Sequence, residues 1–282
     1  MMQVNGVNLF THTQGSSGSS VVMVHGSWGD HHNWDFVAPR LAENHTVVTY
    51  DRRGHSQSER LSSQGSVRDD VADLAALIEE THSGPANVVG NSFGACICLR
   101  LAADRPDLIR SLVIHEPPLV GLIADDPTMA SILQVFGERI GGVVECLSAG
   151  DMAGGARRFV EDIAFGPGAW DQLPSEARET FVANASTFLD ETGDPEGLTL
   201  ELATLKRFDR PALITQGDAG PPMFAPIVER VASAISTASR HTFSGAGHVP
   251  HMTHPDDYVG VVSDFIARRD AVEKGRRSGR AR

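Results

Sequence analysis

A serine at position 92 lies in the pentapeptide Gly90-Asn91-Ser92-Phe93-Gly94, between two apolar runs. Residues 86–89 predict a buried strand, and residues 95–103 are apolar over a length that suits a helix. G-x-S-x-G in this context is typical of a nucleophile elbow, whose tight turn admits only small residues two positions from the serine. Such a turn exposes the serine hydroxyl and points a helix N-terminus at a developing anion. A plain turn with a capping serine is the alternative, which the flanking strand and helix disfavour.

A nucleophilic serine needs a base within hydrogen-bond reach, and His248 is the candidate. It follows the last expected strand in Gly245-Ala246-Gly247-His248, where two glycines let a loop fold back. The oxyanion needs preorganised donors, and the N–H of Phe93 should be one of them. The second should come from the loop after the strand 21–24, from Gly26 or Ser27, and the sequence does not decide between them. His25 beside them is expected to have a structural role.

The three histidines 248, 251 and 254 form an H-x-x-H-x-x-H comb that could suggest metal ligands. Pro250 and Pro255 interrupt this stretch, so the histidines cannot share one helix face, and no cysteine or carboxylate cluster accompanies them. We therefore expect neither a metal ion nor another cofactor.

Strands must alternate with helices to position these residues. Short apolar runs predict strands, and longer runs with apolar residues three or four apart predict helices between them. The expected strands are 21–24, 46–50, 86–89, 111–114, 211–215 and 239–243, and the main helices are 67–80, 95–103, 222–234 and 255–268. This alternation predicts an α/β fold with a mostly parallel sheet and flanking helices. The alternation stops between residues 118 and 205, where helical material predicts an inserted cap over the strand ends.

Composition narrows the class of protein. The net charge is −12 although residues 268–282 carry seven basic and two acidic side chains, so the body is strongly acidic and nucleic acid is not the expected partner. Residues 269–282 read as a basic, disordered tail. Cys96 and Cys98 cannot face each other on a helix, and no signal or membrane-spanning segment is evident, which indicates a cytoplasmic protein. A homodimer is compatible with these features.

Four motifs in this order are similar to those of the α/β-hydrolase superfamily. They are H-G-S-W-G from residue 25, D-R-R-G-H-S from residue 51, the elbow, and the late G-A-G-H. The resemblance covers about 2–117 and 207–268 and implies an α/β-hydrolase fold with a Ser-His-acid triad, in which Ser92 and His248 take their usual places. The motifs are specific for fold and weak for substrate.

The acid departs from that pattern. Superfamily members usually carry it three residues beyond a glycine, and here Gly220 occupies that place. The stretch His115-Glu116-Pro117-Pro118 resembles the His-Glu-Leu-Pro of zearalenone lactonases, whose glutamate is the triad acid. We favour Glu116, which directly follows its strand and which Pro117 should hold in an extended backbone. Asp218 is the alternative acid.

The leading hypothesis is a cofactor-independent serine hydrolase of a small carboxylic ester or lactone. Hydrolysis of a carbon–carbon bond in a dicarbonyl compound is the second, and a ligand receptor that retains the triad is the third. Apolar cap residues should form the substrate pocket. Its expected binding residues are Trp170, Trp28 and Phe136.

Overall fold

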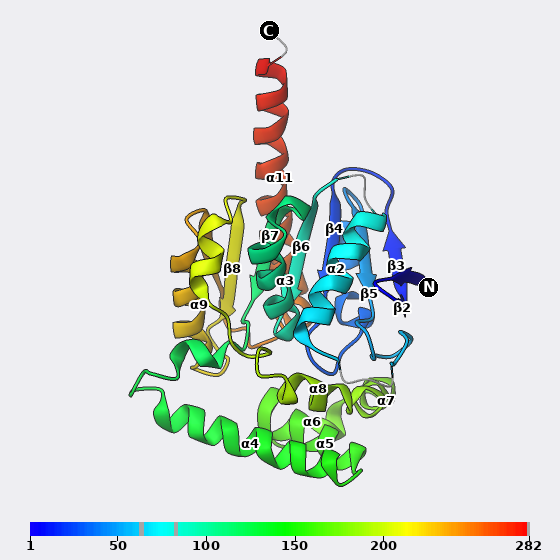
Figure 1. Ribbon diagram of the computed structural model, residues 1–282, viewed down its shortest axis with the longest axis vertical. Coiled ribbons are helices and arrows are strands. Elements are labelled where there is room, and N and C mark those ends of the chain that lie inside the picture. Colours follow the sequence, from blue (N-terminus) through cyan, green and yellow to red (C-terminus); the bar gives the residue numbers. More distant parts are fainter. Residues whose placement is uncertain (62–64, 82–83, 281–282) are drawn as a thin grey trace.

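The computed structural model describes residues 1–61, 65–81 and 84–280, and Figure 1 shows their arrangement. Within these residues one seven-stranded sheet has the order β3-β5-β4-β6-β7-β8-β9, and only β3 runs antiparallel to its neighbour. The strands are β3 (Thr11–Gln14), β4 (Ser20–Val24), β5 (Thr46–Tyr50), β6 (Ala86–Asn91), β7 (Ile109–His115), β8 (Ala212–Gly217) and β9 (Ala238–Phe243). The predicted α/β class and mostly parallel sheet are confirmed.

Helices cover both faces of this sheet because its strands alternate their side chains between two cores. Val22 and Val24 point to the core beneath α2 (Val67–Thr81), α3 (Phe93–Asp104) and α9 (Phe224–Ala234). Val21 and Met23 point to the opposite core, beneath α1 (Ala38–Leu41) and α11 (Pro255–Arg280). The inner strands β4, β5, β6 and β7 are therefore buried on both sides, as their apolar runs indicate.

A small hairpin precedes the sheet. Strands β1 (Met2–Val4) and β2 (Val7–Leu9) pair antiparallel around Asn5 and Gly6, both with positive φ. Two central residues of positive φ define the turn type whose twist matches that of paired strands.

The cap lies between β7 and β8, over the carboxyl ends of the parallel strands (Figure 1). It consists of α4 (Ala130–Ser148), α5 (Met152–Arg158), η4 (Phe159–Ala164), α6 (Ala169–Gln172), α7 (Ser175–Asn184) and α8 (Thr187–Gly193). Short 3₁₀ segments flank it, η3 (Val120–Ile123) before and η5 (Leu202–Arg207) after. Its helices enclose a small apolar core of their own, centred on Trp28, Val143 and Phe188.

The C-terminal region differs from the expected disordered tail. Helix α11 continues through Arg280 and projects beyond the body of the molecule (Figure 1). Residues 269–280 contain no proline and several good helix formers, so they extend a helix already anchored by its first turns. The last two residues of the expected tail, 281 and 282, lie outside the described residues.

Two further sequence expectations concern thiols and membranes. Cys96 and Cys98 are free and buried in α3, and burial raises the pKa of Cys96 to about 12. A thiol held in its neutral form is a poor nucleophile, so these cysteines serve packing. No helix among the residues described is both long and apolar enough to cross a membrane.

His251 is a histidine buried for packing. It lies in α10 (Pro250–Thr253), wholly buried, with its ring centroid 4.6 Å from that of Trp34. Neither ring nitrogen has a hydrogen-bond partner within the described part of the chain. Burial, with a smaller contribution from His248, lowers the pKa of His251 to about 3.

This burial makes folding stability sensitive to acid. Between the ordinary histidine pKa of 6.5 and the folded-state pKa of about 3, His251 is protonated in the unfolded chain but stays neutral in the folded chain. His251 should therefore lower the free energy of unfolding by up to about 1.4 kcal/mol for each pH unit below 6.5. In urea unfolding at pH 7, 6 and 5, His251→Phe should show a shallower loss than wild type. His254→Phe, at a half-buried position, is the control, and equal slopes for His251→Phe and wild type would contradict the expectation.

Candidate active site

Ser92 occupies a strained turn between β6 and α3. Its φ is 55°, and its N–H donates to the carbonyl of His115 at 2.9 Å. A Cβ at Gly90 would lie 2.6 Å from Cys98 Sγ, and one at Gly94 would lie 2.3 Å from the Val24 carbonyl. Both glycines are therefore required by close approach, which is the geometry that the G-x-S-x-G pattern predicts.

Glu116 contacts His248 directly. The His248 Nδ1–H donates to Glu116 Oε2 at 2.7 Å, and the Gly217 N–H donates to Oε1 at 2.8 Å. Glu116 is fully buried, so these bonds form away from solvent. With Nδ1 occupied as a donor, His248 Nε2 is left as the nitrogen that can accept a proton. His248 and Ser92 line the same cavity.

The backbone of Glu116 is not extended, contrary to the expectation drawn from Pro117. Its φ is 43°, in the left-handed region that non-glycine residues rarely adopt. Its N–H donates to the Thr215 carbonyl at 3.2 Å, so pairing with β8 outweighs the preference that the following proline imposes. Ser92 and Glu116 thus both hold a strained backbone, and such strain gathers at functional sites.

Asp218 has a different partner from His248. It is exposed, and its Oδ1 accepts the N–H of Gly245 at 2.6 Å, which ties the β8 loop to the loop that carries the histidine. Gly220, in the usual place of the acid, lies beside the Glu116 carboxylate. A Cβ at Gly220 would be 3.6 Å from Oε1 and 3.8 Å from Oε2. An acid at either position would therefore reach the same space.

Three further side chains lie around the histidine, and the sequence did not predict this place for them. Asn91 Nδ2 donates to the His248 carbonyl at 3.0 Å, and the Phe224 ring stacks on the imidazole at 4.6 Å between centroids. His115, wholly buried, lies 6.2 Å from His248 between ring centroids. Burial and repulsion from His248 lower the pKa of His115 well below its usual value. A neutral His115 does not compete with His248 for the charge of the Glu116 carboxylate.

The loop after β4 approaches Ser92 from the other side. A Cβ at Gly26 would lie 2.9 Å from Ser92 Cβ, and Ser27 lines the cavity together with Phe93. His25 behaves as a structural residue, since its Nδ1 bonds the Gly26 carbonyl at 2.8 Å and its Nε2 accepts the Arg52 N–H at 2.9 Å. Burial lowers the pKa of His25 to about 4, so the ring is neutral near pH 7.

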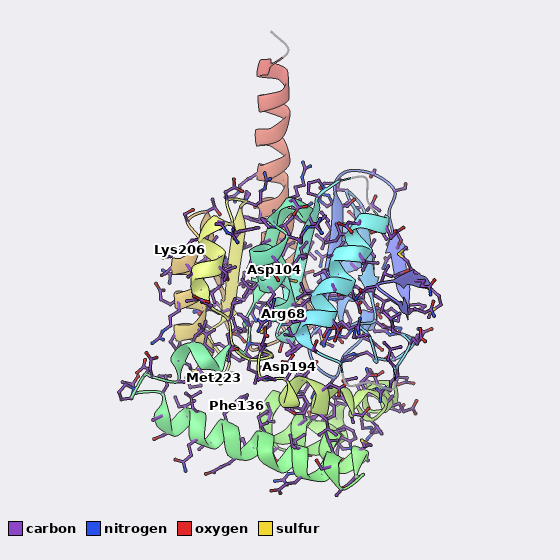
Figure 2. All side chains as sticks on the ribbon, viewed as in Figure 1. Arg68, Asp104, Phe136, Asp194, Lys206 and Met223 are labelled. Atoms are coloured by element: carbon purple, nitrogen blue, oxygen red, sulfur yellow. The ribbon has the colours of Figure 1, made fainter. Side chains whose placement is uncertain are left out.

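The cavity above Ser92 has a volume of about 480 Å³ and is lined mainly by apolar side chains. Phe136 of α4 and Met223 before α9 lie on facing sides of the space between cap and core (Figure 2). Other apolar lining residues are Ile132, Val135, Ile140, Phe159, Ile163, Phe188, Leu198 and Phe224.

Two of the expected binding residues lie elsewhere. Trp170 of the short helix α6 borders a separate, shallow hollow with Arg178 and Val182, and it packs, partly buried, against the apolar core of the cap. Trp28 is fully buried and stacks on Phe159 at 4.8 Å between ring centroids, so it supports the cavity wall from behind. The presence of an aromatic residue in a cap helix does not reveal which face of that helix lies toward the core.

The histidine comb does not converge on one point. His248 faces Glu116, whereas His251 packs on Trp34. Over the described ranges, the groups close enough to share a metal ion are Asp30, His31 and His32, and His115, Glu116 and His248. In the second group the His248 Nδ1 and both Glu116 oxygens are engaged in the hydrogen bonds given above, which suits a proton-transfer pair better than a metal site.

Known proteins resemble the chain over nearly its whole length. It is 26% identical over 284 residues to 2-hydroxymuconate semialdehyde hydrolase of Pseudomonas sp. (strain CF600), covering 95% of this chain and 93% of that protein. An alpha/beta hydrolase from Sphaerobacter thermophilus DSM 20745 superposes with a TM-score of 0.76 at 26% identity, covering 94% of this chain and 99% of that one.

A shorter match is closer in sequence. The uncharacterized hydrolase YraK of Bacillus subtilis (strain 168) is 38% identical over 124 residues, which is 43% of this chain and 45% of that protein. The chain thus aligns with less than half the length of this relative. The sequence model of the alpha/beta hydrolase family matches residues 21–261, which include the elbow, Glu116, the cap and His248. The chain therefore belongs to the alpha/beta hydrolase family.

Proposed function

We propose that the chain is a serine hydrolase of a small carboxylic ester or lactone, with Ser92, His248 and Glu116 as its triad. The observation that carries this proposal is the 2.7 Å hydrogen bond from His248 Nδ1 to the buried Glu116 carboxylate, in the cavity that Ser92 lines. Held in that tautomer, the imidazole presents Nε2 as the base for a serine hydroxyl.

The reaction would proceed through an acyl-enzyme. Ser92 Oγ attacks the ester carbonyl as His248 Nε2 takes its proton, and Glu116 stabilises the imidazolium. The N–H groups of Phe93 and of Gly26 or Ser27 donate hydrogen bonds to the oxyanion. The imidazolium then protonates the leaving alcohol, and a water molecule activated by His248 releases the acid and restores Ser92. No metal or organic cofactor enters these steps.

Apolar cap residues such as Phe136 would bind the hydrocarbon part of the substrate. A cavity of about 480 Å³ lies in the range of small-molecule sites. The wall is mainly apolar and also carries Ser92 and His248, which favours a substrate with a reactive carbonyl on an apolar body.

A panel of aryl esters of rising acyl length, supplemented with lactones, tests this function. We expect turnover in seconds for at least one member, with a preference for medium acyl chains that fill the cavity. Release of the aryl alcohol at steady state, followed by absorbance, is the measurement. Binding accompanied by one slow turnover at most would instead support a receptor.

Hydrolysis of a carbon–carbon bond is the second candidate, and the similarity to one hydrolase from Pseudomonas supports it. The Pseudomonas relative, which matches over 95% of this chain, is named for 2-hydroxymuconate semialdehyde, a substrate that is not an ester. The same compound therefore belongs in the panel. Faster turnover of it than of every ester and lactone would move the assignment to this candidate.

A further inference from the structure

Arg52 is a buried cation that the proposed reaction does not use. Arg52 is the second residue after β5, and its side chain is only 2% exposed. The guanidinium donates to both Asp70 oxygens of α2 at 3.2 Å. It also donates twice, at 2.9 and 2.8 Å, to Glu191 Oε1 of α8. One carboxylate from the core and one from the cap thus share a single guanidinium.

Burying the Glu191 carboxylate costs free energy, because Asp70 already neutralises the charge of Arg52. Burial raises the pKa of Glu191, while Arg52 and the neighbouring Ser27 hydroxyl favour its charged form. Its other oxygen, Oε2, has no well-aligned hydrogen bond within the described ranges. A carboxylate kept under these conditions calls for a role beyond pairing.

Arg52 contacts both sides of the proposed oxyanion hole. Its Nη1 donates to the Gly26 carbonyl at 3.3 Å, and its guanidinium lies 4.8 Å from the centre of the Phe93 ring. The Gly26 carbonyl and the Ser27 N–H belong to one trans peptide unit, in which they point in opposite directions. A carbonyl anchored toward Arg52 therefore turns the Ser27 N–H away from it. The same geometry favours Ser27 over Gly26 as the donor.

We propose that Glu191 is a positioning residue for the oxyanion hole. By holding Arg52 from the cap side, it fixes the Gly26–Ser27 peptide and the Phe93 side chain so that two N–H groups meet the oxyanion. The proposal rests on the serine hydrolase function given above. It also makes the cap part of the catalytic geometry, since α8 supplies the carboxylate.

Loss of the Glu191 charge and loss of its positioning role predict opposite changes of kcat for Glu191→Gln. Removing a negative charge near a developing oxyanion would, by charge alone, raise the rate. Loss of positioning lowers it, because oxyanion donors act only when they are preorganised. The sign of the change in kcat therefore separates the two effects.

The test measures kcat and KM on the best ester of the panel for wild type, Glu191→Gln and Glu196→Gln. Glu196 also pairs with a core arginine, Arg68, at 2.7 Å, but at the surface and away from the oxyanion loop, so Glu196→Gln is the matched control. We expect Glu191→Gln to lower kcat about 10- to 100-fold with KM within about twofold. The control should match wild type.

Inhibitors sharpen the readout. A trifluoromethyl ketone built on the same acyl group forms a tetrahedral oxyanion on the serine, whereas the corresponding carbinol does not. In Glu191→Gln, affinity for the ketone should fall by the same factor as kcat/KM, and affinity for the carbinol should stay constant. An unchanged or raised kcat in Glu191→Gln overturns the proposal. A raised KM together with an equal fall in affinity for the ketone and for the carbinol also overturns it, because that pattern indicates a change in the shape of the cap.

A second pair of variants covers the case that Glu191→Gln does not fold. Ser27→Ala removes the hydroxyl beside Glu191 and should lower kcat several-fold at constant KM, while Ser27→Thr, which keeps a hydroxyl, should restore it. Equal kcat in the two variants overturns the proposal. Labelling of wild-type Ser92 by a fluorophosphonate tests the hydrolase function separately, so failure of that function is distinguishable from failure of this inference.

Discussion

Ser92→Ala should lower turnover by about six orders of magnitude and leave a folded protein. The expected loss is large because the members of a triad act as a unit, and without Oγ no acyl-enzyme forms. The fold should survive because the Ser92 side chain makes no capping hydrogen bond to α3, and alanine keeps the Cβ that the turn accommodates. Steady-state turnover of the best panel ester and the melting temperature are the measurements.

Ser175→Ala is the control, since it makes the same change on an exposed turn of α7, where the Ser175 hydroxyl donates to the neighbouring Glu176 carboxylate. It should retain wild-type turnover. If Ser92→Ala keeps more than a few per cent of activity, another group is the nucleophile.

Glu116→Gln should lower turnover by up to four orders of magnitude. The glutamine keeps the volume of the side chain but offers the His248 Nδ1 an amide without charge, so neither the tautomer nor the imidazolium is stabilised. Asp218→Asn is the matched comparison and should cost less than tenfold, because Asp218 Oδ1 bonds the Gly245 N–H and not the histidine. The reverse order of the two losses would assign the acid to Asp218.

Gly220 offers a rescue of the same variant. With Glu116→Ala the space of the carboxylate is empty, and an aspartate introduced as Gly220→Asp would extend into it from 3.6 Å away. We expect the double variant to turn over at least about tenfold faster than Glu116→Ala alone, a small part of the loss that a removed triad acid causes. Equal turnover of Glu116→Ala and of the double variant would mean that the acid works only from the end of β7.

Much of the fold could be predicted because local patterns and global structure agree. The apolar runs at 21–24 and 46–50 end within a residue of β4 and β5, since strands buried on both faces must be continuously apolar. The elbow could be identified because a strand, a tight turn and a helix that follow one another leave a short pattern, in which Gly90 must be small beside Cys98 of the following helix. Local steric demands leave a local sequence pattern.

The remaining features depend on contacts far apart in the chain. The bond from Gly217 to Glu116 joins strands about a hundred residues apart, and it accompanies a backbone that Pro117 alone would not predict. Trp170 could not be placed, because the orientation of a short cap helix is decided by its neighbours. Arg52 stood in a motif that indicated the family, and its role depends on a cap residue 139 positions away.

Several polar contacts between cap and core lie on the stretch of the cap from Asn184 to Asp194. Asn184 Nδ2 donates to the carbonyls of Trp28 and Gly29 at 3.2 and 2.9 Å, Thr187 bonds His55 at 3.0 Å, and Asp194 accepts the Val67 N–H at 2.7 Å. Helix α4 instead presents Ile132, Phe136 and Ile140 to the cavity. Substitutions on α4 can therefore change which molecules fit without loosening the catalytic groups. In related proteins with this architecture, substrate preference can therefore change through residues of α4 while selection preserves the polar contacts between the rest of the cap and the core.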